Sequence, residues 1–229
     1  MLKVVKAQLL DVLPLEIGFI YAERTKLPTG EETVAFYVYD QDSERILPVK
    51  IKTYLEAKFG LQYREIARKI GNYLACDAAK LKSNGVTTLF NDGSISIFDS
   101  NGKVFFKDKL VYQNCPIRSL ALDDNCFWCV VPDRNSVVKF SPVERKVVFR
   151  IGGGASVAFR RPVSIAKYDD KLFVCNESAN MVKTVNLKDY SVRDYIQCKE
   201  PVKKYFRVGF VEYVVLESGI YSIDLSDKM

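Results

Sequence analysis

The chain has 229 residues, of which 48% are hydrophobic and 27% are charged, and this globular composition excludes disordered and collagen-like chains. It contains no histidine, so catalytic systems built on Ser-His-Asp, on Cys-His or on histidine-bound zinc are excluded. Lysine and arginine number 34 against 28 aspartates and glutamates. The net charge of +6 is compatible with loose affinity for phosphates or acidic surfaces, but the basic residues lack the clustering of a dedicated nucleic-acid binder.

The first eleven residues do not resemble a signal peptide, because Lys3, Lys6 and Asp11 interrupt the apolar run that such a peptide needs. No later stretch approaches the roughly 18 consecutive apolar residues of a membrane span. The six cysteines are scattered along the chain, which is typical of proteins in a reducing compartment. We therefore expect a cytoplasmic protein that does not contact membranes.

In chain order, the sequence first predicts an apolar strand over residues 2–10 and another strand over 34–40. Between residues 51 and 81 the apolar residues recur every three or four positions, which predicts a helical insertion over about residues 52–75, broken at Gly60. Further strands that resemble 34–40 are expected at 94–99, 137–141, 181–186 and 220–224.

Two segments in the middle of the chain repeat one pattern. Residues 116–130 and 162–176 each begin with proline, continue with an apolar run, reach Asp-Asp at the seventh and eighth positions after the proline and end in a second apolar run. Each segment predicts two strands around a tight acidic turn, and a third and a fourth strand follow in both. The unit is therefore a four-stranded antiparallel meander.

The third strand of this unit recurs five times, mostly at the 40-to-50-residue spacing of propeller blades. Because a small sheet cannot bury both of its faces alone, five such units are expected to pack in a ring. The sequence thus predicts an all-β fold, a single five-bladed β-propeller over residues 1–229 with a helical insertion at 52–75. We expect the strand at 2–10 to close the ring with the C-terminal strands and so remove an exposed edge.

Residues 114–200 resemble the NHL-type repeat, and residues 171–196 are also similar to the YVTN-type repeat. The resemblance rests on glycine followed by Phe159 and Pro162, and then on an apolar, acidic-turn, apolar pattern. In those families this arrangement forms one propeller blade, so the resemblance implies a fold and no particular activity. Asn176 and Pro132 depart from the pattern, because many family members carry aspartate after the second strand.

Two short motifs have structural explanations. Cys126 and Cys129 form a Cys-x-x-Cys pair in an apolar run that predicts a strand, where residues three apart point to opposite faces, and we interpret them as structural rather than redox-active or metal-binding. The glycines at 152–154 are not followed by a helix or by Lys-Ser/Thr, as in a phosphate loop, and we interpret them as a connector between blades.

Six acidic residues are candidates for a carboxylate-bound metal of the kind found in propellers that resemble lactonases: Asp92, Asp123, Asp124, Asp169, Asp170 and Glu177. Nearly all fall at predicted hairpin turns, where aspartate is favoured because it hydrogen-bonds to the local backbone. We therefore assign no catalytic, cofactor-binding or metal-binding residue.

Seven basic residues are candidates for contacting a ligand or RNA: Arg145, Lys146, Arg160, Arg161, Lys203, Lys204 and Arg207. The stretch 203–207 also contains tyrosine and phenylalanine, which would suit single-stranded nucleic acid if the rings were free to stack on bases. A half-buried strand explains the same alternation.

The leading hypothesis is a non-catalytic binding module that recognises a protein, peptide or polymer through loops at one end of the propeller. One alternative is an RNA-binding propeller that uses a basic face, as some NHL propellers do. The other is a carboxylate-metal hydrolase or lactonase. We expect no cofactor, and the sequence does not identify the partner.

Overall fold

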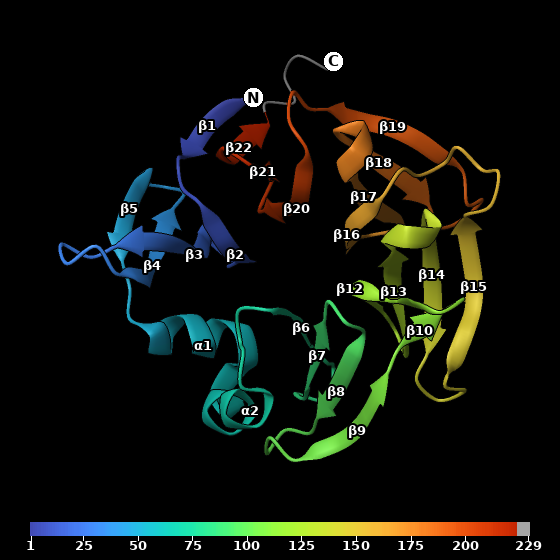
Figure 1. The fold of residues 1–229 in the computed structure, drawn as a ribbon, viewed down its shortest axis with the longest axis horizontal. Coiled ribbons are helices and arrows are strands. Elements are labelled where there is room, and N and C mark those ends of the chain that lie inside the picture. The colour runs from blue at the N-terminus through green and yellow to red at the C-terminus, as the bar shows by residue number, and fades with distance from the viewer. Residues whose placement is uncertain (224–229) are drawn as a thin grey trace.

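The computed structural model describes residues 1–223, which form a ring of five four-stranded antiparallel sheets around a central channel (Figure 1). This confirms the predicted five-bladed, all-β propeller. In the first four blades the strands follow one another from the channel to the rim. Blade 1 contains β2 (Leu9–Pro14), β3 (Phe19–Lys26), β4 (Glu32–Asp40) and β5 (Arg45–Pro48); blade 2 contains β6 (Cys76–Lys80), β7 (Val86–Phe90), β8 (Ser94–Phe98) and β9 (Val104–Lys109).

The other blades have the same antiparallel order. Blade 3 contains β12 (Arg118–Asp123), β13 (Cys126–Val131), β14 (Ser136–Ser141) and β15 (Lys146–Gly152); blade 4 contains β16 (Pro162–Tyr168), β17 (Lys171–Asn176), β18 (Met181–Asn186) and β19 (Val192–Gln197). Blade 5 contains β20 (Val202–Val208), β21 (Val211–Leu216), β22 (Gly219–Ile223) and β1 (Leu2–Val5). A short ribbon of β10 (Val111–Tyr112) and β11 (Cys115–Pro116) joins blades 2 and 3.

Blade 5 combines strands from distant parts of the chain. Strand β1 pairs antiparallel with β22, and Leu2 lies opposite Ser222. The segment expected as one strand at 2–10 is therefore two strands, because residues from Leu9 onward belong to β2 in blade 1. Residue 224, at the end of the last expected strand, lies outside the described residues.

A helical wedge fills the space between blades 1 and 2 (Figure 1). It consists of α1 (Ile51–Phe59), a 3-10 turn (Gly60–Gln62) and α2 (Tyr63–Ile70), which confirms the expected insertion and its interruption at Gly60. Tyr54 is fully buried against blade 1, and Phe59 and Ile66 are fully buried against blade 2. The helices end at Ile70, before the expected residue 75, because Gly71 adopts a φ of 74° that reverses the chain.

The junction between blades 1 and 5 is aromatic. The Phe19 ring is fully buried and stacks on Tyr39 with 4.9 Å between centroids. Phe206 and Tyr213 each meet Phe19 edge to face at 5.3 Å. Such pairs each contribute about 0.5–1.5 kcal/mol beyond the burial of their apolar area. They hold together the two blades whose shared boundary completes the ring.

The ring has two faces, which alternate along the chain because successive turns of a meander lie at opposite ends of the strands. We call the face that carries the segments between blades the connector face; it includes residues 6–8, 71–75, 110–117, 153–161 and 198–201. The opposite face carries the turns after the first and the third strand of each blade, such as residues 124–125 and 142–145. Among residues 1–223 no helix is both long and apolar enough to cross a membrane.

Closure of blade 5 depends on Gly219. Its φ is 141°, and a Cβ placed there would collide with the Val5 carbonyl oxygen of β1. We expect Gly219→Ala to lower the free energy of unfolding by about 3 kcal/mol, because a backbone collision adds to the conformational strain. Denaturant unfolding, monitored by the fluorescence of the single tryptophan, measures this loss.

Gly30→Ala is the matched control, because Gly30 also has a positive φ of 87° but has no neighbouring atom within 4 Å of the position that a Cβ would take. Its free energy of unfolding should fall by only about 1 kcal/mol, because this variant adds backbone strain without a collision. Equal losses in the two variants would contradict a closing role for the close approach of β1 to β22.

Candidate functional site

A ring of polar side chains surrounds the middle of the channel, one from each innermost strand. We call Asp11, Asp77, Ser119, Ser164 and Lys204 the channel ring; they come from β2, β6, β12, β16 and β20. All five line both of the adjoining cavities, of about 360 and 280 Å³, that make up the channel. This places the channel ring where the two cavities meet.

A recurring β-bulge accompanies these side chains. The pairing register shifts between Leu9 and Asp11 in β2, and the same shift occurs near the start of β12, β16 and β20. A bulge re-aims the neighbouring side chains of a strand. In β6 the pairing is regular, and Asp77 lies opposite Leu89 without a bulge.

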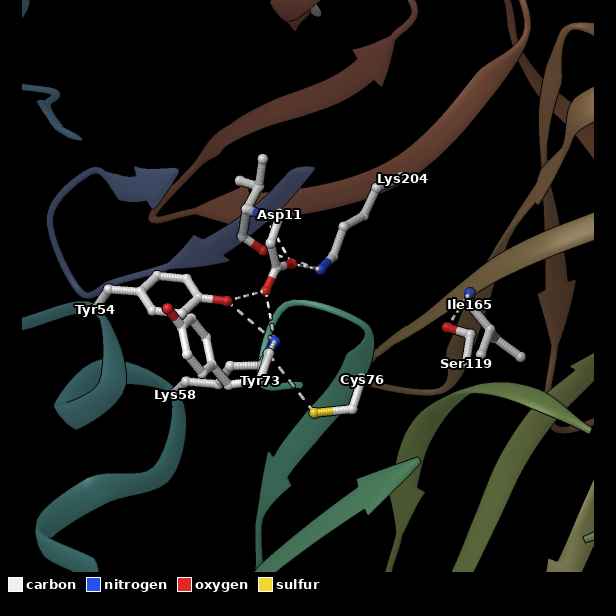
Figure 2. Close-up of polar contacts among 9 residues, drawn as sticks. Asp11, Tyr54, Lys58, Tyr73, Cys76, Ser119, Ile165 and Lys204 are labelled. Carbon is white, nitrogen blue, oxygen red and sulfur yellow. Dashed lines mark hydrogen bonds and ion pairs between the residues drawn. The ribbon is translucent and has the colours of Figure 1, made fainter. Parts of the chain in front are cut away.

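The Asp11 carboxylate is the most heavily bonded group of the channel ring (Figure 2). Its Oδ2 accepts hydrogen bonds from Tyr54 Oη and from Lys58 Nζ, each at 2.6 Å. Its Oδ1 accepts a bond from the Val12 backbone N–H at 2.8 Å and lies 3.6 Å from Lys204 Nζ. Lys58 is only 4% exposed and also donates to the Tyr73 carbonyl oxygen at 2.7 Å.

The charges around Asp11 decide its protonation. Burial by itself raises the pKa of the Asp11 carboxyl, but the charges of Lys204 and Lys58 and the hydrogen bonds from Lys58 and Tyr54 outweigh it, so the pKa is lowered. For Lys204, burial lowers the pKa, and the charges of Asp11 and Asp77 more than compensate, so the pKa is raised. Both groups are therefore charged at neutral pH.

A partly buried carboxylate lies nearer the opposite face. Asp123, the last residue of β12, accepts a hydrogen bond from Trp128 Nε1 at 3.0 Å and pairs with Lys139 at 2.7 Å and Lys167 at 3.4 Å. Asp123 therefore belongs to a strand and holds a structural network, which corrects its interpretation as a turn residue. The turn itself is formed by Asp124 and Asn125.

The other candidate acids do lie at turns or short helical turns. Asp92 accepts bonds from Ser94, Asp124 and Asp169 have φ of 54° and 51°, and Glu177 pairs with Arg161. In the part of the chain that the structure describes, no group of three or more histidine, cysteine or acidic residues is arranged to hold a metal ion. Cys126 and Cys129 lie in β13 as free thiols, and the glycines at 152–154 end β15 and begin the connector to β16, as expected.

The seven basic candidates do not gather on one surface. Arg160, Arg161 and Lys203 lie on the connector face, whereas Arg145 and Lys146 lie on the opposite face. Most are engaged by neighbours: Arg161 pairs with Glu177, Lys203 with Glu217, Lys146 with Glu144, and Arg145 lies over the Phe106 ring. Lys204 lies inside the channel.

Arg207 is part of the packing between blades 4 and 5. Its guanidinium lies 4.6 Å from the Phe173 ring centroid and 5.0 Å from that of Tyr168, and it donates to Glu212 at 2.6 Å. Glu212 is 2% exposed, so Arg207 neutralises a buried charge. Tyr205 and Phe206 are also 2% exposed, which leaves neither ring free to stack on a base.

Sequence reasoning missed Asp11, Asp77, Lys58 and the two serines of the channel ring. A signal was present, because Asp11 and Lys204 each interrupt an apolar strand that borders the predicted centre of the ring. Lys58 carried no such signal. It lies in a helix among other charged residues, and only the three-dimensional packing of the wedge brings its ammonium to the channel.

No protein-family model matches the sequence, and no curated protein matches it. Solved structures do match. Selenomethionine-substituted virginiamycin B lyase from Staphylococcus aureus is 12% identical, with a TM-score of 0.56 over 94% of this chain and 80% of that one. The WD40 β-propeller domain of Doa1 is 13% identical, with a TM-score of 0.54 over 92% of this chain and 61% of that one.

A streptogramin B lyase structure is 13% identical, with a TM-score of 0.51 over 88% of this chain. The chain spans 63% of that protein, so both it and the Doa1 domain are substantially longer than this propeller. At these identities the likeness shows the propeller fold alone.

The Lys58–Asp11 pair should be essential for stability. We expect Lys58→Met to lower the free energy of unfolding by about 3–5 kcal/mol, because it leaves the Asp11 carboxylate buried with fewer partners. Lys82→Met is the control, since Lys82 and Asp124 pair at 2.9 Å with side chains 88% and 82% exposed. It should cost about 0–1 kcal/mol in the same denaturation assay. Similar losses would contradict a special role for the buried pair.

The contribution of Asp11 should disappear in acid. Its pKa is lower in the folded chain than the value of about 3.9 expected in the unfolded chain, so its charged form stabilises the fold above that pH. The stability difference between the natural chain and Asp11→Asn should therefore be constant near neutrality. It should shrink as the pH falls below about 4, as measured by denaturation midpoints across that range. A stability difference that grew as the pH fell would contradict a lowered pKa of Asp11 in the folded chain.

Proposed function

We propose that the protein is a non-catalytic binding module that recognises an extended peptide segment of a protein partner on its connector face. The observation that carries this proposal is a continuous groove there. Three hollows adjoin one another: the first two share Leu10, Leu74 and Ala75, and the third shares Ala75 and Asn91 with the second. We call these four residues the connector-face groove.

The groove has the chemistry of a peptide site. Leu10 and Leu74 are partly exposed apolar side chains, and the amides of Asn72 and Asn91 lie at its margins. The groove extends to the Arg24–Glu32 ion pair, which joins β3 and β4 of blade 1 beside the turn between them, and to the mouth of the channel. Apolar hollows beside hydrogen-bonding amides suit an extended chain whose side chains alternate in direction.

The other two functions have less support. An RNA-binding face would need unengaged cations and exposed rings on one surface, but the basic candidates are divided between two faces and mostly paired. A hydrolase would need converging carboxylates, and the candidate acids are dispersed: Asp123 ends β12 and pairs with two lysines, and the other five lie at turns or short helical turns. One lyase structure is described as a catalytically inactive histidine-to-alanine variant, and this chain has no histidine.

Assignment to the NHL or YVTN repeat type is part of the proposal and rests on residues 114–200. A cytoplasmic location also belongs to it, and is supported by six free cysteines among the described residues, of which four are buried.

A displayed random-peptide library, selected on the immobilised full chain, tests the function. We expect enriched peptides whose synthetic forms bind in solution by fluorescence polarisation. Ala75→Trp should weaken this binding at least about tenfold, because the indole would fill the exposed centre of the groove. Failure to enrich any peptide above a bare surface would refute the proposal.

Ala155→Trp is the matched control, because Ala155 is equally an exposed alanine in a segment between blades, but it does not line the groove. It should leave the affinity unchanged. Peptides that bind both tryptophan variants as well as the natural chain would place the binding surface elsewhere and contradict the groove.

A further inference from the structure

The channel ring has hydrogen-bonding capacity that its own residues do not use. Within the described residues, the Asp77 carboxylate accepts no hydrogen bond and makes no ion pair, and the Ser164 hydroxyl, in a residue 8% exposed, has no hydrogen bond either. Lys204 Nζ donates to the Val12 carbonyl oxygen at 2.9 Å and lies 3.6 Å from Asp11, which leaves one ammonium hydrogen available. These groups all border the same cavities.

The order of the blades sets these groups around the channel. Going round the ring, Lys204 of blade 5 and Asp77 of blade 2 flank Asp11 of blade 1, and the hydroxyls of Ser119 and Ser164 follow on blades 3 and 4. Asp11 is already bonded to the helical wedge. An anionic group on blade 2 and a cationic group on blade 5 therefore remain accessible in the same cavities.

The charges in this region balance. Around the channel ring, Asp11 and Asp77 contribute two negative charges, and Lys58 and Lys204 contribute two positive charges. Two further lysines line the cavities, but each is paired with an acid of its own: Lys167 with Asp123 at 3.4 Å and Lys203 with Glu217 at 3.5 Å. A ligand with a single charge would upset this balance inside the channel, whereas a ligand with one charge of each sign would not. We propose that the channel ring binds a small zwitterion, a free α-amino acid, with its ammonium against Asp77 and the serine hydroxyls and its carboxylate against Lys204.

The size of the channel agrees with such a ligand. Its cavities, of about 360 and 280 Å³, border the lower end of the range for small-molecule sites. The walls beside Asp77 and Ser164 are formed by the small side chains Ala78, Ala79 and Ala166, which leave the space open. The raised pKa of Lys204 keeps its ammonium charged for the carboxylate. The cavity of about 280 Å³ opens into the connector-face groove, but the charged and hydroxyl groups used here are not among the four residues that define the groove, so the proposal does not rest on peptide binding.

Titration calorimetry of the full chain with each common α-amino acid in turn tests this site. We expect saturable binding of at least one of them. The decarboxylated amine and the N-acetylated form of the same compound should each bind at least about tenfold more weakly, because each lacks one of the two charges. If no amino acid binds up to about 10 mM, or if the amine alone binds as tightly, the proposal is wrong.

Variants locate the site. Asp77→Asn should weaken binding of the amino acid at least about tenfold, and Ser164→Ala a few-fold. Asp170→Asn is the control, because Asp170 is a turn residue on the opposite face that pairs with Lys188 at 3.0 Å. Unfolding midpoints equal to that of the natural chain show that each variant is folded. Undiminished binding by a folded Asp77→Asn chain would overturn the site.

Discussion

The buried carboxylate of Asp11 is the contact on which the junction of blades 1 and 2 depends. Elsewhere in the ring, neighbouring blades pack directly on each other with apolar side chains. At this junction a helical wedge intervenes, and its polar anchor is the pair of bonds from Tyr54 and Lys58 to Asp11. Because an ionised group in the interior must be compensated, the carboxylate helps to fix the position of α1 together with the apolar contacts.

The same carboxylate links the wedge to the chemistry of the channel. Lys204 approaches Asp11 from blade 5, so one aspartate connects three parts of the molecule: blade 1, the helices and the blade that completes the ring. Since Asp11 is satisfied by these partners, Asp77 and Lys204 are the charged groups of the channel ring with bonding capacity to spare. Asp11 thus holds the blades and the helical wedge together, while Asp77 is the acid that can bind the proposed ligand.

The fold could be predicted from the sequence because each blade repeats a local pattern of alternating apolar residues and turns, and because period and turn chemistry act over a few residues. The helices were also predictable from their three-to-four spacing. The channel was not, because its residues converge from all five blades, and a bulge in four inner strands changes where their side chains point. The boundary between strand and turn was also mispredicted at residues 123–124. The repeat alignment places both aspartates in the turn, whereas the pairing of Asp123 with Cys126 keeps Asp123 in β12.

The pairing of β1 with β22 also has a consequence for how the chain folds. Leu2 and Ser222 are neighbours in space but 220 positions apart, so loop-closure entropy opposes their contact until the intervening blades have formed. During synthesis, strand β1 therefore has no pairing partner until β22 has been made. We therefore expect completion of the ring to be a slow, non-local step of folding. Until β1 pairs with it, the edge of β22 can pair with a strand of a second chain.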